Sequence, residues 1–199
     1  MKKLEDIELK IENENEDGVF AISLVDRPAI QEHFIALSEH NIELKVVDED
    51  KRILVGLALV PNKKIYRNVN GKEFNVFFSE QTIEKTNELF MRNLNLNSIT
   101  SQHETKVSGV SVIESWIVED EKNDKSNLYN LNAVKGSWAV KMKVYNDEEW
   151  NKVKLGEYKG FSIEGIYQGL DKLQASEQPQ EEDFTTDIIE FLKSIWVNI

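Results

Sequence analysis

The sequence predicts a mainly β (α+β) domain with two or three helices, and three observations lead to this fold class. Several short segments alternate apolar and polar residues with a period of two, as pleated strands do. Residues 53–60 are apolar almost throughout, which is typical of a strand covered on both faces. Asn70-Gly71 separates two apolar runs and therefore indicates a β-hairpin.

The predicted strands are bounded by residues that interrupt a ladder. Gly18 separates a weak strand at 7–11 from a buried strand at 19–25, and Pro28 ends the second strand because proline has no N–H to donate. Pro61 ends the apolar strand in the same way. The remaining strands are expected at 42–47, 65–67, 74–78, 99–105, 110–118, 136–145 and 160–167.

Helices are predicted where a capping residue precedes a helical pattern. Ser79 can accept a hydrogen bond from the first turn of a helix at 80–95. Asn146 precedes three acidic residues and begins a shorter helix, which Gly156 is placed to end. The amphipathic segment at 184–197 completes the set of helices.

Changes in composition divide the chain into three parts. Residues 1–17 form a polar, acid-rich segment, and residues 18–170 hold the main β domain. Residues 171–199 contain a flexible acidic linker, rich in Gln, Glu, Ser and Pro, and then the C-terminal amphipathic helix. The amphipathic stripe of this helix could pack on the domain or on a second copy of the chain.

The composition excludes several classes of protein and site. None of the 199 residues is cysteine, which excludes disulfides, zinc thiolate sites and a cysteine nucleophile and suits a cytosolic protein. The net charge of −12 argues against nucleic acid as a partner. No apolar run has the length of a membrane span, and no signal-peptide pattern follows Met1.

The strand at 160–167 carries the first candidate for chemistry. Phe161 and Ile163 alternate with Ser162 and Glu164, so the serine and the carboxylate share one face. Two glycines border the pair, and a glycine in a strand often marks the close approach of a ligand. Ser162 is therefore either a solvent-facing strand residue or a nucleophile served by nearby backbone N–H groups.

Histidines supply the second group of candidates. His103 lies in a polar segment, where it is either a surface residue or a general base. His33 and His40 lie among Gln and Glu residues and are expected at the surface.

Glu114 is the third candidate, because its alternation with Val112 places a carboxylate on an apolar strand face, where it needs a partner. A hairpin of residues 101–114 would put His103 opposite Val112, with Glu114 as a diagonal neighbour able to orient the imidazole. The alternative partners of Glu114 are three basic residues: Lys141, Lys143 and Arg67.

Four blocks of the sequence resemble, in order, the signature blocks of the prohead serine proteases that mature the capsids of tailed phages. The blocks are ISLVDRPA at 22–29, SQHE at 101–104, VIESWIV at 112–118 and GFSIEG at 160–165. That family is similar to herpesvirus assemblin. The resemblance therefore implies an assemblin-like β-barrel flanked by helices, with a Ser–His dyad and a variable third member.

The resemblance implies roles for particular residues. Ser162 would be the nucleophile and His103 the base. Assemblin uses a second histidine after the serine, but this chain has no histidine after His103, so an acidic residue is expected instead. Glu114 is the choice on geometry, and Glu164 is the alternative third member.

The predicted function is a serine endopeptidase that cuts scaffold protein, major capsid protein and itself during phage head maturation. It would act inside the assembling prohead in the cytoplasm of the bacterial host, without a cofactor or metal ion. Since the resemblance implies self-cleavage, the linker and helix at 174–197 would be a removable tail or a segment that docks into the scaffold. A homodimer is one expected assembly; nucleic acid and membrane partners are not expected.

Two other functions remain open at this stage. The same fold could be a non-catalytic assembly module that binds scaffold or capsid protein and leaves Ser162 and His103 unused. A metal hydrolase using His103, Glu104 and Glu114 is a weaker alternative, because one histidine and no cysteine make a poor ligand set.

Overall fold

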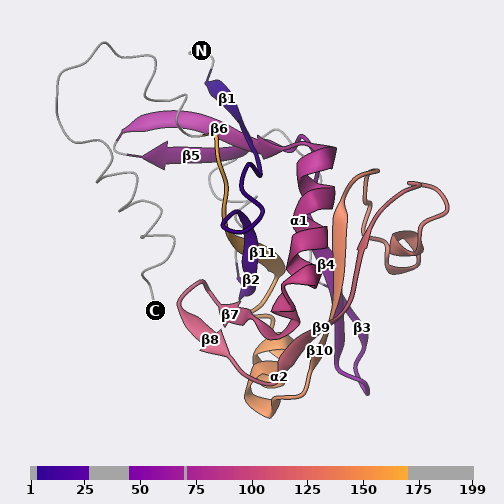
Figure 1. Ribbon diagram of the computed structural model, residues 1–199. Helices are drawn as coiled ribbons and strands as arrows, with labels where there is room; N and C mark the ends of the chain where they lie inside the picture. Colours follow the sequence, from indigo (N-terminus) through magenta and orange to yellow (C-terminus); the bar gives the residue numbers. More distant parts are fainter. Residues whose placement is uncertain (1–3, 27–44, 70, 170–199) are drawn as a thin grey trace, which may run out of the picture.

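The computed structural model describes residues 4–26, 45–69 and 71–169, whose strands form three open sheets (Figure 1). The first sheet has the order β1 (Glu5–Leu9), β6 (Lys72–Phe78), β5 (Ile65–Val69). The second has the order β3 (Lys45–Asp48), β4 (Ile53–Leu59), β10 (Trp138–Val144), β9 (Val110–Ile117). The third has the order β11 (Gly160–Ile166), β2 (Gly18–Val25), β7 (Ile99–Ser101), β8 (Thr105–Val107).

Helices cover and join these sheets. The α-helices are α1 (Glu80–Arg92) and α2 (Asp147–Lys154), and two short 3₁₀ helices are η1 (Asn95–Asn97) and η2 (Lys125–Tyr129). The mainly β class with two or three helices is therefore confirmed. The strand ladders of the described ranges stay open at their edges, and they do not by themselves close the predicted barrel.

The core lies where the two four-stranded sheets and α1 meet. Helix α1 contacts β2 of one sheet and β9 and β10 of the other, and β11 lies against β4 (Figure 1). Phe90 of α1 meets Trp138 of β10 edge to face, with ring centroids 5.3 Å apart. Both side chains are fully buried, so this contact joins the helix to the sheet with a large apolar area.

Local sequence signals account for several elements. The Ser79 side chain accepts a hydrogen bond from Thr82 N–H, as predicted for the cap of α1. Asn146 caps α2 by accepting from the N–H groups of Glu148 and Glu149. The Asn-Gly hairpin is confirmed, since β5 and β6 pair antiparallel.

The polar N-terminal segment is part of the folded body. Its weak strand is β1, which pairs in parallel with β6, and Ile7 is buried in the core. Lys10 and Gln168 exchange two backbone hydrogen bonds of 2.8 Å, so the segment is also tied to the residues after β11. The division of the chain at residues 17 and 170 stays a prediction.

Several predictions concern residues outside the described ranges. These are the surface positions of His33 and His40, the linker and the C-terminal helix of 171–199. Among the described residues, no helix is long and apolar enough to cross a membrane.

Candidate active site

Three hydroxyl side chains form a row across the middle of the third sheet. Ser162 of β11 is directly opposite Ser23 of β2, and Ser23 is directly opposite Thr100 of β7. Directly paired residues point to the same face, with Cβ atoms about 5 Å apart in an antiparallel pair. Glu164 lies two residues along β11, on this same face, as the sequence predicted.

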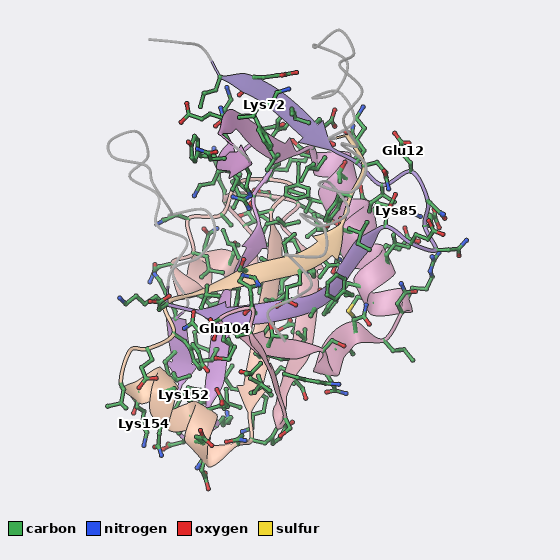
Figure 2. The ribbon with its side chains drawn as sticks, turned by 90° about the vertical axis from the view of Figure 1, so that its left-hand side faces the viewer. Glu12, Lys72, Lys85, Glu104, Lys152 and Lys154 are labelled. Atoms are coloured by element: carbon green, nitrogen blue, oxygen red, sulfur yellow. The ribbon has the colours of Figure 1, made fainter. Side chains whose placement is uncertain are left out.

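His103 lies in the turn that joins β7 to β8, not on a strand as predicted. Gln102 and His103 have φ of 54° and 60°, and Glu104 N–H donates to Ser101 O at 2.9 Å to close the turn. Positive φ costs an L-residue on the order of 1–2 kcal/mol. Such a conformation persists only when its surroundings hold it, and it is common at functional sites. In Figure 2, Glu104 marks this turn, and Lys152 and Lys154 mark α2 below it.

The turn brings the His103 ring to Glu164. His103 Nδ1 lies 3.1 Å from Glu164 Oε1, the oxygen that also accepts a hydrogen bond from Thr100 Oγ1. An ionised carboxylate only accepts hydrogen bonds, so in the neutral imidazole Nδ1 carries the proton and Nε2 is the acceptor. This is the tautomer that a general base needs when it takes a proton from a serine.

Glu164 is held as a carboxylate despite its burial. Burial raises the pKa of Glu164 and is the largest single influence on it. The hydrogen bonds from His103 and Thr100, together with the charge of His103, outweigh burial, so the pKa lies below its ordinary value. The Glu164 side chain is 9% exposed and that of His103 is 37% exposed, so the imidazole is the part of the pair open to solvent.

Ser162 lies beside this pair without being bonded to it. Ser162 is 5% exposed, and among the described residues no hydrogen bond joins it to His103. Catalytic hydrogen bonds are often long in ligand-free enzymes and shorten when substrate binds. Lys159 N–H donates to Val25 O at 2.8 Å, so this amide near Gly160 is already occupied and is not free to hold an oxyanion.

The predicted proximity of Glu114 to His103 is wrong, because the strands pair differently. Strand β7 pairs with β8, and β9, which carries Glu114, pairs with β10 in another sheet. The ladder also shifts register, since Lys141 is opposite Glu114 but Met142 is opposite Val112. One extra residue, Ile113, is accommodated there as a β-bulge. Because of the bulge, Glu114 and Val112 point to different faces of the sheet.

On that face Glu114 has basic partners. Its carboxylate forms ion pairs with Lys125 and, at 2.6 Å, with Lys141, one of the basic partners considered from the sequence. The hydrogen bonds from these two lysines lower the pKa of Glu114 and outweigh its partial burial. Lys125 also lies over the Trp116 ring, 4.0 Å from its centroid. Glu114 therefore belongs to a surface ion-pair cluster.

Sequence reasoning missed Ser23 and Thr100 as parts of the site. Ser23 stands alone as a polar residue in the otherwise apolar run from Val19 to Val25. A buried polar group almost always has a hydrogen-bond partner, so a serine at this position could have indicated a specific contact. Thr100 offered no comparable signal, because its partner Glu164 is 64 residues away in the chain.

The ligands of the metal-hydrolase alternative are not brought together. Across the described part of the chain, no group of three or more His, Asp and Glu side chains is placed to hold a metal ion. His103 is bound to Glu164, and Glu114 to its lysines, in different sheets.

A serine and a carboxylate on one sheet face, with a histidine from the adjoining turn in contact with the carboxylate, are the groups that a serine hydrolase uses. The sequence model of the family described as "Putative phage serine protease XkdF" matches residues 41–171, which is more than half of the chain. The chain therefore belongs to this family of phage serine proteases. Searches of curated proteins and of solved structures gave no match.

Proposed function

We propose that this protein is a serine endopeptidase with Ser162 as nucleophile, His103 as general base and Glu164 as the third member. The observation that carries the proposal is the contact of His103 Nδ1 with Glu164 Oε1 next to Ser162 on β11. Membership of the phage serine protease family supports the same reaction. Glu164 takes the place that the sequence interpretation gave first to Glu114.

The reaction proceeds in two halves. His103 Nε2 takes the Ser162 proton while Ser162 Oγ attacks the peptide carbonyl carbon, and the resulting imidazolium gives that proton to the leaving amine. Water then attacks the acyl-enzyme with His103 again as base, which releases the acid and restores Ser162. Throughout, the Glu164 carboxylate holds the ring orientation and stabilises the imidazolium.

The proposed substrates are the scaffold protein, the major capsid protein and the chain itself during phage head maturation. This assignment rests on the family and on the sequence resemblance to prohead proteases. The proposed location is the interior of the assembling prohead in the bacterial host. An assemblin-like relationship is proposed for the Ser–His dyad.

Intact mass tests this proposal. The chain and its Ser162→Ala variant are each expressed with and without a scaffold protein from the same phage, and both are followed over hours. The proposal predicts that only the intact chain cuts the scaffold or itself. Cleavage by both chains, or by neither, would contradict it.

One observation favours the alternative of a non-catalytic assembly module. Ser162 is almost fully buried and is not hydrogen-bonded to His103 among the described residues. If neither chain cleaves but both bind the scaffold with the same affinity, the module accounts for the result.

A further inference from the structure

We propose that Ser23 is a positioning residue that holds His103 in its catalytic conformation, an inference that rests on the proposed function. Ser23 Oγ accepts a hydrogen bond of 2.9 Å from His103 N–H, across 80 positions of the sequence. The family match begins at residue 41 and so leaves β2 out.

Ser23 has no other evident reason to be polar. It is fully buried in β2, where nearly all the other residues of the strand are buried and apolar. A hydroxyl at such a position is costly unless it is bonded. Its bond goes to the backbone of the candidate general base.

Three hydrogen bonds attach the turn to the end of β2 and to the residue that follows the strand. Gln102 N–H donates to Leu24 O at 2.9 Å, and Gln102 Oε1 accepts from Asp26 N–H at 3.1 Å. These two bonds fix Gln102. The bond that His103 N–H donates to Ser23 fixes His103 itself, which has a positive φ that its own sequence does not favour.

Because Ser23 lies between the proposed catalytic groups, loss of its bond to His103 would disturb the geometry of the whole site. On the sheet face, Ser23 stands between Ser162 and Thr100, and Thr100 bonds to the Glu164 oxygen that His103 contacts. If the Ser23 hydroxyl is removed, His103 can relax toward negative φ, which moves its ring away from Glu164 and Ser162. A shift of about 1 Å can cost about 100-fold in rate.

The test compares Ser23→Thr with Ser23→Val, which have the same shape and differ in the hydroxyl. The readout is covalent labelling of Ser162 by a fluorophosphonate probe, followed by intact mass at several probe concentrations. Labelling at several probe concentrations gives two separate quantities, the maximal labelling rate and the probe concentration at half of that rate. Ser137→Ala is the matched control, because Ser137 is equally buried and its hydroxyl has no hydrogen-bond partner among the described residues.

We expect the valine variant to lose about tenfold to 100-fold in maximal rate, with the half-saturating concentration unchanged. The threonine variant and the control should stay within about threefold of the intact chain. Amide exchange at His103 should be faster with valine than with threonine. Equal maximal rates for valine and threonine would overturn the proposal.

Two further outcomes are separable. If the valine variant does not fold, Ser23→Ala replaces it; failure of both, with a folded threonine variant, would make Ser23 purely structural and overturn the proposal. If the intact chain is not labelled at Ser162, the proposed function fails. If Ser162 is labelled but the maximal rate is the same in all residue-23 variants, only the proposed role of Ser23 fails.

Discussion

Two glutamates on two different sheets have different environments, and on that basis we propose different roles for them. Glu164 lies on β11, is 9% exposed and meets the imidazole of His103 and the hydroxyl of Thr100. Glu114 lies on β9, is 35% exposed and meets two lysines. Both pKa values lie below the ordinary range, so the pKa alone does not distinguish the two sites.

The difference lies in what each carboxylate can do for its partner. An ion pair between a glutamate and a lysine in contact with solvent contributes little to stability, because water and salt screen the charges. A buried carboxylate beside an imidazole fixes a tautomer and a ring orientation, which is a property that catalysis can use. Partner chemistry and burial therefore separate the carboxylate that we propose for catalysis from the one in the surface ion-pair cluster.

The largest effect should come from removing the partner that is unique to Glu164. His103→Ala should lower the rate of Ser162 labelling by a fluorophosphonate about 100-fold to 10,000-fold, because the general base is lost. His40→Ala serves as the control and should leave the rate unchanged. If Ser162 of the His103→Ala variant is labelled at the normal rate, contact with His103 does not give Glu164 a catalytic role that Glu114 lacks.

The same substitution at the two glutamates makes the comparison direct. Glu164→Gln should lower the labelling rate about tenfold to 100-fold, because the amide no longer holds the imidazole in position as the carboxylate does. Glu114→Gln should change it by less than about twofold, since a surface ion pair contributes little. If Glu114→Gln proves the more damaging change, the original choice of Glu114 would be restored.

Acid should weaken the contribution of Glu164 to stability. Its folded pKa is lowered from an unperturbed value of 4.5, so its contribution is present above that value and is lost as pH falls through the folded pKa. Urea unfolding between pH 7 and pH 3 should show the intact chain and Glu164→Gln converging in acid. In the His103→Ala background this loss of stability should be smaller. The pKa of Glu164 is then lowered less, because His103 no longer counteracts the effect of burial.

The smallest effect concerns salt. Glu114→Gln should lower the free energy of unfolding by about 0–1 kcal/mol, and this difference should shrink in 1 M NaCl. Glu164→Gln should cost about 1–3 kcal/mol, because neutral hydrogen bonds replace two bonds to a charged acceptor in a buried place, and salt should alter this cost little. Equal salt sensitivity in chemical denaturation would mean that the two sites are equally exposed.

Local signals predicted most elements of the fold. The cap at Ser79, the Asn-Gly hairpin and the alternation around Trp138 act over a few residues, so they can be read from the sequence. The sheet order is not local. The parallel pairing of β1 with β6 depends on residues about 70 positions apart, which no periodicity reveals.

The candidate site was predictable only in part for the same reason. Ser162 and Glu164 share a strand, so their common face followed from a period of two. The bulge at Ile113 shifts that period within β9, and it reversed the face predicted for Glu114. The contact of His103 with Glu164 depends on a turn held by β2, which only the folded chain brings into place.

A crystal structure of the chain after reaction with a fluorophosphonate would test the central claim most directly. The account predicts phosphorus bonded to Ser162 Oγ, His103 Nε2 within hydrogen-bond reach of that oxygen, and Nδ1 still on Glu164. Phosphorus on another residue, or a His103 ring turned away from both Ser162 and Glu164, would contradict the account.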